Sequence, residues 1–131
     1  HFYNPAIHYF VRSRSEAVTS NTGTKFTPSF ATYTGIDGVL TLTLGAGHGL
    51  VAGSNTVQIA NDSIIFTCTQ DGNSTEHGYP RATDPYAGSN IAIASTTTTT
   101  IAVNVGISSA GGLVAPLQME FIASILENST A

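Results

Sequence analysis

The chain has 131 residues, 41% of them hydrophobic, which suits one domain with its own core and excludes a disordered tail. Only 9% of the residues are charged and the net charge is −4; the one close basic pair is Arg12 and Arg14, so we expect no nucleic-acid binding. No run of about 18 apolar residues occurs, so we expect no membrane-spanning helix.

The polar residues are mainly Ser, Thr, Asn and Gly, a mixture that favours strands and turns over helices. A surface poor in Lys and Glu also suits burial against neighbouring subunits, because interface cores are depleted of charge. The single cysteine, Cys68, lies in an apolar stretch and is interpreted as a buried hydrophobe, not a reactive thiol. The first residue is His1, which leaves open a processed terminus or an excerpt of a longer protein.

Residues 1–34 are interpreted as an N-terminal arm followed by strands. Residues 7–12 alternate with a period of two, but both faces of a strand here would carry an aromatic side chain, Tyr9 on one and Phe10 on the other. A strand that is apolar on both faces is usually covered on both sides. Tyr9 and Phe10 are therefore candidate contacts with a neighbouring subunit. Pro28 predicts that any strand in 24–34 lies at a sheet edge or is interrupted.

Residues 35–112 are interpreted as a self-contained core module. Within 39–44, Leu40, Leu42 and Leu44 alternate with threonines, which predicts a strand with the leucines facing inward. Further strands are predicted near 55–59, 63–69, 91–95 and 101–107, with the apolar side chains Val57, Ile59, Ile64, Phe66, Cys68, Ile91, Ile93, Ile101, Val103, Val105 and Ile107 on their inner faces. Turn signals recur about every ten residues, as in a sandwich or small barrel.

Residues 70–90 are expected to form a long polar loop. Arg81 and Asp84 are three residues apart across a bend, and an Arg–carboxylate pair would fix that bend. Tyr79 and Tyr86 are expected to lie over apolar surface while their hydroxyls stay in water. We favour a loop held by its own salt bridge; an intersubunit contact and a host-glycan site remain as alternatives.

Residues 113–131 are interpreted as a C-terminal connector tail. Leu117, Phe121 and Ile125 fit helical spacing, but Met119, Phe121, Ala123 and Ile125 equally fit a strand. Because of the β context we favour a strand that leaves the core and pairs elsewhere. An apolar tail on a small domain usually requires a partner, so Phe121 and Ile125 are candidate assembly contacts.

No motif for metal or cofactor binding or for catalysis is present. The histidines lack zinc-ligand spacing, and the segment from Asp71 resembles a calcium loop only at its start, because Glu76 stands where that motif requires Gly. There is no G-x-S-x-G nucleophile motif and no suggested pair of glycosidase carboxylates. We expect no enzymatic activity, no metal and no cofactor.

Four stretches carry a resemblance to a known domain: DGVLTLTLGAGHGL (37–50), VQIANDSIIFTC (57–68), DGNSTEHGYPRATDPYAGS (71–89) and IAVNVGISS (101–109). They resemble a domain found, often in several copies, in virion structural proteins of marine tailed phages that infect cyanobacteria. The resemblance covers roughly the middle 70 to 80 residues. It implies a structural role in a phage particle and no catalytic activity.

The expected fold is all-β, an antiparallel β-sandwich or barrel-like domain with extended terminal arms. The expected function is that of a capsid decoration or tail-associated subunit of the virion, whose partners are other copies of itself and neighbouring virion proteins. One alternative is a fibre-tip module that binds host surface glycan, which predicts an aromatic-lined groove near Tyr79 and Tyr86. The other is an extracellular filament subunit.

Overall fold

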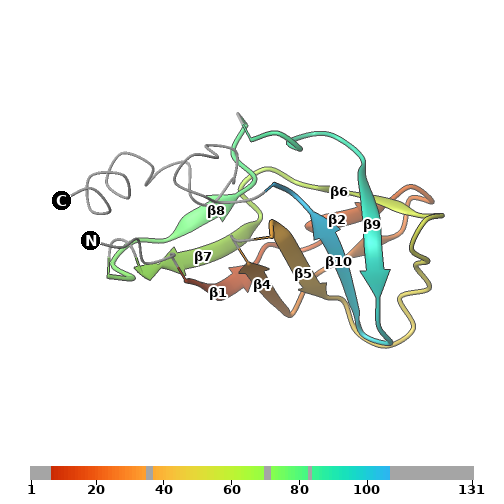
Figure 1. Ribbon diagram of the computed structural model, residues 1–131, viewed down its shortest axis with the longest axis horizontal. Helices are drawn as coiled ribbons and strands as arrows, with labels where there is room; N and C mark the ends of the chain where they lie inside the picture. Colours follow the sequence, from red (N-terminus) through yellow and green to blue (C-terminus); the bar gives the residue numbers. More distant parts are fainter. Residues whose placement is uncertain (1–6, 35–36, 70–71, 83, 107–131) are drawn as a thin grey trace.

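The computed structural model describes residues 7–34, 37–69, 72–82 and 84–106, which form two antiparallel sheets packed together as a β-sandwich (Figure 1). The smaller sheet has the strand order β1-β7-β8, and the larger has the order β3-β2-β6-β9-β10-β5-β4. The predicted fold class is confirmed. The strands are β1 (His8–Ser13), β2 (Val18–Ser20), β3 (Lys25–Phe26), β4 (Phe30–Thr34), β5 (Val39–Thr43), β6 (Thr56–Ile59), β7 (Ile64–Cys68), β8 (His77–Tyr79), β9 (Ile91–Thr96) and β10 (Thr100–Asn104).

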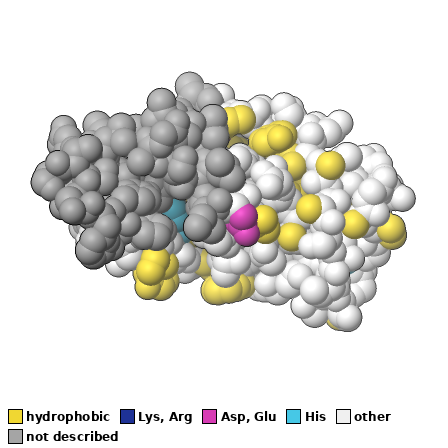
Figure 2. All heavy atoms as spheres, viewed as in Figure 1, with side chains coloured by type: hydrophobic (Ala, Val, Ile, Leu, Met, Phe, Trp, Pro, Cys, Tyr) yellow, Lys and Arg dark blue, Asp and Glu magenta, His cyan; other side chains and the backbone are white. Residues whose placement is uncertain are grey.

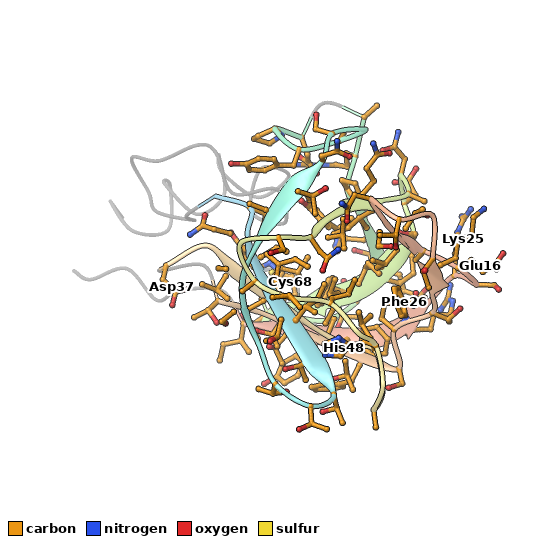
Figure 3. The ribbon with its side chains drawn as sticks, turned by 90° about the vertical axis from the view of Figure 1, so that its right-hand side faces the viewer. Glu16, Lys25, Phe26, Asp37, His48 and Cys68 are labelled. Carbon is orange, nitrogen blue, oxygen red and sulfur yellow. The ribbon has the colours of Figure 1, made fainter. Side chains whose placement is uncertain are left out.

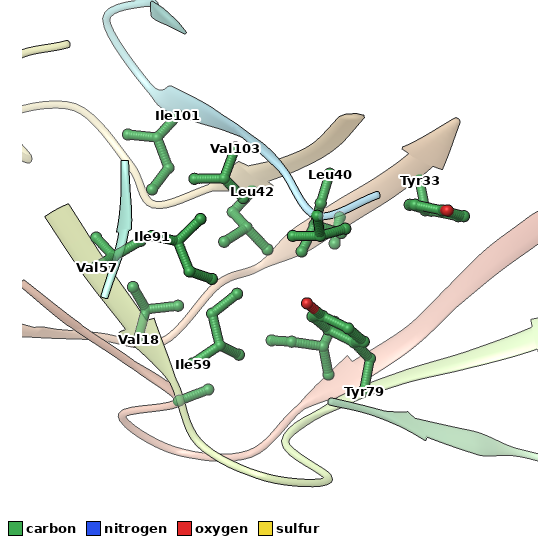
Figure 4. Packing of buried hydrophobic residues seen from close by; sticks show 14 of the residues in the cluster. Val18, Tyr33, Leu40, Leu42, Val57, Ile59, Tyr79, Ile91, Ile101 and Val103 are labelled. Carbon is green, nitrogen blue, oxygen red and sulfur yellow. The ribbon is translucent and has the colours of Figure 1, made fainter. Parts of the chain in front are cut away.

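The core lies between the two sheets and is built by the period-two alternation of apolar side chains. In β5, Leu40 and Leu42 are fully buried, and the threonines between them face outward. β10 pairs with β5 so that Ile101 lies opposite Leu42 and Val103 opposite Leu40. Figure 4 shows these four side chains packed together. Most inward positions predicted for the other central strands are also confirmed, whereas Ile107 lies outside the described residues. The buried ones are Val57, Ile59, Ile64, Phe66, Cys68, Ile91, Ile93 and Val105.

Residues 8–34 differ from the expectation of an arm in front of a separate core module. β1 pairs with β7 in the smaller sheet, whereas β2 pairs with β6 and β4 pairs with β5 in the larger one. Val18, Ala31 and Tyr33 are buried in the same cluster as the central strands. Residues 8–34 therefore complete both sheets, and position 35 does not divide an arm from the core. As Pro28 predicts, β4 is an edge strand.

The segment expected to be a polar loop contains strand β8. His77, Gly78 and Tyr79 pair with Phe66, Ile65 and Ile64 of β7. A Cβ added to Gly78 would lie 3.0 Å from Asp62 Cα, so this strand can approach the turn before β7 only with glycine at that position. β8 completes the smaller sheet on the side opposite β1.

Candidate functional site: an apolar face on strands β1 and β4

Strand β1 turns a row of apolar side chains towards solvent. Ile7, directly before the strand, is 54% exposed, and Tyr9 and Val11 are 51% and 40% exposed. Because side chains alternate along a strand, Phe10 points inward, and its ring packs edge-to-face against Phe66 of β7. The structure therefore separates the two predicted contacts: Tyr9 is open to a partner, and Phe10 packs against the core.

A fourth exposed apolar side chain lies on the neighbouring strand β4. Phe30 is 51% exposed, and its ring meets the Phe10 ring edge-to-face, with 5.7 Å between centroids. Strands β1 and β4 lie side by side although they belong to different sheets (Figure 1). Figure 2 shows hydrophobic side chains along the rim below these two strands. We call the set Ile7, Tyr9, Val11 and Phe30 the β1/β4 face: its members lie on or directly before two neighbouring strands, and Phe30 is joined to β1 through the Phe10 ring.

The two edges of the larger sheet differ in how they are protected. β3, at one edge, is two residues long and carries Lys25, whose side chain projects into solvent near Glu16 (Figure 3). Short edge strands with charged side chains discourage pairing with another chain. β4, at the other edge, is five residues long and has no charged residue. The edge that lacks this protection is the one that carries Phe30.

An ion pair borders the β1/β4 face. The Arg12 guanidinium donates two hydrogen bonds to the Glu76 carboxylate, of 2.8 and 3.1 Å, and about half of each side chain is exposed. The hydrogen bond from Arg12 holds the pKa of Glu76 below its ordinary value, and that of Arg12 is raised. The pair links β1 to the segment before β8, across β7. The Glu76 carboxylate is thus paired with Arg12 of the same chain.

The outer face of the larger sheet carries little charge. On strands β4, β5, β9 and β10 the outward positions hold only uncharged side chains, namely Phe30, Thr32, Thr34, Val39, Thr41, Thr43, Ala92, Ala94, Thr96, Thr100, Ala102 and Asn104. Figure 2 looks onto these strands and shows hardly any charged side chain there. A sheet face without charge resembles the centre of a protein interface more than an ordinary surface.

The predicted Arg81–Asp84 pair is confirmed in the loop after β8. The Asp84 carboxylate is buried; Oδ2 accepts the backbone N–H of Arg81 at 2.7 Å, and Oδ1 accepts Nη2 of the same residue at 2.9 Å. Backbone bonds from Asp84 N to Arg81 O and from Ala87 N to Asp84 O continue the turn. The carboxylate therefore holds the bend from within, which favours the interpretation of a loop ordered by its own salt bridge.

The two tyrosines of this loop behave differently, and one expectation is corrected. Tyr86 is 36% exposed, but Tyr79 is buried and its ring enters the core (Figure 4). The reason is its position in β8 opposite Ile64, on the inward face of the smaller sheet. The Tyr79 hydroxyl is buried rather than wet, and has no hydrogen-bond partner among the described residues. Burial, and secondarily the charge of Asp84, raise the pKa of Tyr79 above its ordinary value.

The groove expected for glycan binding is not formed by Tyr79 and Tyr86, because Tyr79 is buried. A hollow of about 290 Å³ does lie nearby, beside the end of this loop. The residues around it are uncharged and include no aromatic ring on which a sugar could stack: Thr19, Gln58, Ile59, Ala60, Asn61 and Gly88.

The side chains of His48 and Cys68 are held within the fold. His48 joins two turns: Nδ1 accepts the Leu50 N–H at 3.0 Å, and Nε2 lies 2.8 Å from the Thr97 carbonyl oxygen, to which it donates. Cys68 is buried in β7, as predicted (Figure 3). In the described part of the chain, no group of three or more His, Cys, Asp or Glu side chains is placed to hold a metal ion.

Ile7, Val11 and Phe30 were not among the candidate contacts predicted from the sequence. Ile7 and Val11 share the period-two phase of Tyr9, so the alternation that identified Tyr9 also pointed to them. Phe30 had no such signal, because its place beside β1 depends on how the two sheets pack. The candidates Phe121 and Ile125 lie outside the described residues.

No helix in the described residues is long and apolar enough to cross a membrane. Comparisons of the chain with protein-family models, with curated proteins and with solved structures gave no match.

Proposed function

We propose that the chain is a non-enzymatic structural subunit of a tailed-phage virion, a capsid decoration or tail-associated subunit that acts through assembly contacts. The observation that carries this proposal is the β1/β4 face, where four large apolar side chains are 40–54% exposed on two adjacent sheet edges. Clustered apolar side chains on the surface of a soluble domain are typical of interaction sites. The partners are other copies of the chain and neighbouring virion proteins.

The size of the driving force fits an assembly contact. Removing the exposed part of each of these side chains from water contributes roughly 1 kcal/mol, so the face offers several kcal/mol per copy before association costs. Those costs offset most of this amount. A single contact made through this face is therefore weak, and a symmetric particle multiplies it.

Two further observations support the proposal. The outer face of the larger sheet is uncharged across β4, β5, β9 and β10, which suits contact with another protein surface. The sequence stretches 37–50, 57–68, 71–89 and 101–109 resemble a recurring domain of cyanophage virion proteins. The fibre-tip glycan alternative has less support, because Tyr79 is buried and only Tyr86 is left for stacking. A filament subunit would use the same face but repeat it along an open helix.

The proposal is tested by size-exclusion chromatography with light scattering, which gives the mass of the purified chain and of two matched variants. Tyr9→Asp places a charge in the β1/β4 face, and Tyr86→Asp places the same charge at an exposed tyrosine outside that face. We expect the unmodified chain and Tyr86→Asp to assemble, and Tyr9→Asp to elute as a folded monomer. Equal assembly of the two variants would refute the role of this face. Loss of glycan binding in Tyr86→Asp alone would favour the fibre-tip alternative.

A further inference from the structure

We infer that the β1/β4 face is covered by the C-terminal segment Leu113–Leu126 of a second copy of this chain. This inference rests on the proposed assembly function and specifies its contact. It requires that the segment starts near the face, that its chemistry fits, and that the occupant comes from another copy.

The described chain ends beside the face. The Tyr33 hydroxyl of β4 donates a hydrogen bond to the Gly106 carbonyl oxygen at 2.7 Å, and Val105 N–H is bound by the Gly38 carbonyl at 2.8 Å. The Tyr33 ring packs edge-to-face on His8 of β1, with 5.3 Å between centroids. The point at which the chain continues towards residue 107 is therefore fixed next to both strands that form the face.

The residues that follow have the composition of a linker and an apolar binding segment. Residues 107–112 read ISSAGG, in which every residue after Ile107 is small, and six residues span about 20 Å at full extension. Residues 113–126 read LVAPLQMEFIASIL, in which Glu120 is the only charged residue. An apolar segment with one charge matches a surface of exposed Ile, Tyr, Val and Phe side chains.

We assign the segment to a second copy because exchange of segments between copies uses both the face and the segment as assembly contacts. The four side chains of the face are 40–54% exposed, so they are accessible to a neighbouring copy. Each copy carries one such face and one such segment, so two copies that exchange segments cover both faces and close with twofold symmetry. If each copy instead passes its segment to the next copy around a ring, the ring also closes with every face covered. Both arrangements suit a symmetric particle.

The test is a complementation experiment with full-length variants. Tyr9→Asp disables the face and keeps the segment, whereas the double variant Phe121→Asp/Ile125→Asp disables the segment and keeps the face. Circular dichroism and thermal unfolding verify that each variant is folded; Val11→Asp replaces Tyr9→Asp if the latter is not. Light scattering then measures the mass of each variant alone and of a mixture in which one variant carries a tag of different mass.

We expect each variant alone to assemble at least tenfold more weakly than the unmodified chain. The mixture regains one functional contact, so it forms a one-to-one complex of the tagged and untagged variants. A mixture that stays monomeric overturns the inference. If the double variant assembles like the unmodified chain, the inference fails while the proposed assembly function stands. An unmodified chain that is monomeric throughout refutes both.

Discussion

Replacing Asp84 by Asn tests how the loop after β8 is held. The change keeps the size of the side chain and one acceptor oxygen, which can still bind the Arg81 backbone N–H, now 2.7 Å from Oδ2. The Arg81 guanidinium loses its negatively charged partner. In the unmodified chain it contacts that carboxylate through a 2.9 Å bond from Nη2 to Oδ1 and a long 3.5 Å contact from Nε to Oδ2.

The expected cost follows from these contacts. A hydrogen bond to a charged group contributes about 1.5–3 kcal/mol, and the Nε contact is at the limit of a hydrogen bond. The Arg81 side chain is 21% exposed, so water compensates part of the loss, whereas the Asp84 side chain is fully buried. We therefore expect Asp84→Asn to lower the free energy of unfolding by about 2 kcal/mol. Urea denaturation followed by circular dichroism measures this difference.

Glu76→Gln is the matched control, because Arg12 and Glu76 form the same type of pair with both side chains about half exposed. We expect no measurable change in stability, since exposed pairs contribute little. The pKa of Glu76 is lowered in the folded chain, so whatever the pair contributes is present at neutral pH and is lost as the pH falls through that lowered pKa. If Asp84→Asn were as stable as the unmodified chain, or the two changes cost the same, the argument from burial would be refuted.

Three further changes test the core. Tyr79→Phe removes a buried hydroxyl that has no partner among the described residues, so stability should stay the same or rise; a loss of more than about 1 kcal/mol would mean that the hydroxyl has a partner elsewhere. Gly78→Ala places a Cβ 3.0 Å from Asp62 Cα and should destabilise by about 1–3 kcal/mol in denaturant unfolding; an unchanged midpoint would contradict the close approach. Phe66→Ala empties the site where Phe10 packs and should cost about 3–5 kcal/mol by the same assay, and a cost below about 1 kcal/mol would show that the core is not packed there.

The parts of the fold that the sequence predicted are those set by local alternation. Leu40 and Leu42 face inward because their neighbours are threonines, and a period of two is readable without knowing the partner strand. Strand β8 could not be predicted in the same way. His77–Tyr79 is too short to show a period, and it is a strand because β7 offers an edge for it.

The candidate site was predictable in proportion to how local its contacts are. Arg81 and Asp84 are three residues apart, and their pairing follows from the bend between them. Arg12 and Glu76 are 64 residues apart, so their pairing depends on the topology of the smaller sheet. The sequence left open whether Tyr9 or Phe10 faces the core, because both faces of their strand are apolar. The packing of Phe10 against Phe66 shows that Phe10 is inside and Tyr9 outside.

The central claim is that this chain assembles through contacts of its own surface, and sedimentation velocity over a dilution series tests it most directly. The account predicts a species whose mass is a whole multiple of 13.5 kDa and which dissociates on dilution. A single species of 13.5 kDa at every concentration, up to the limit of solubility, would contradict it.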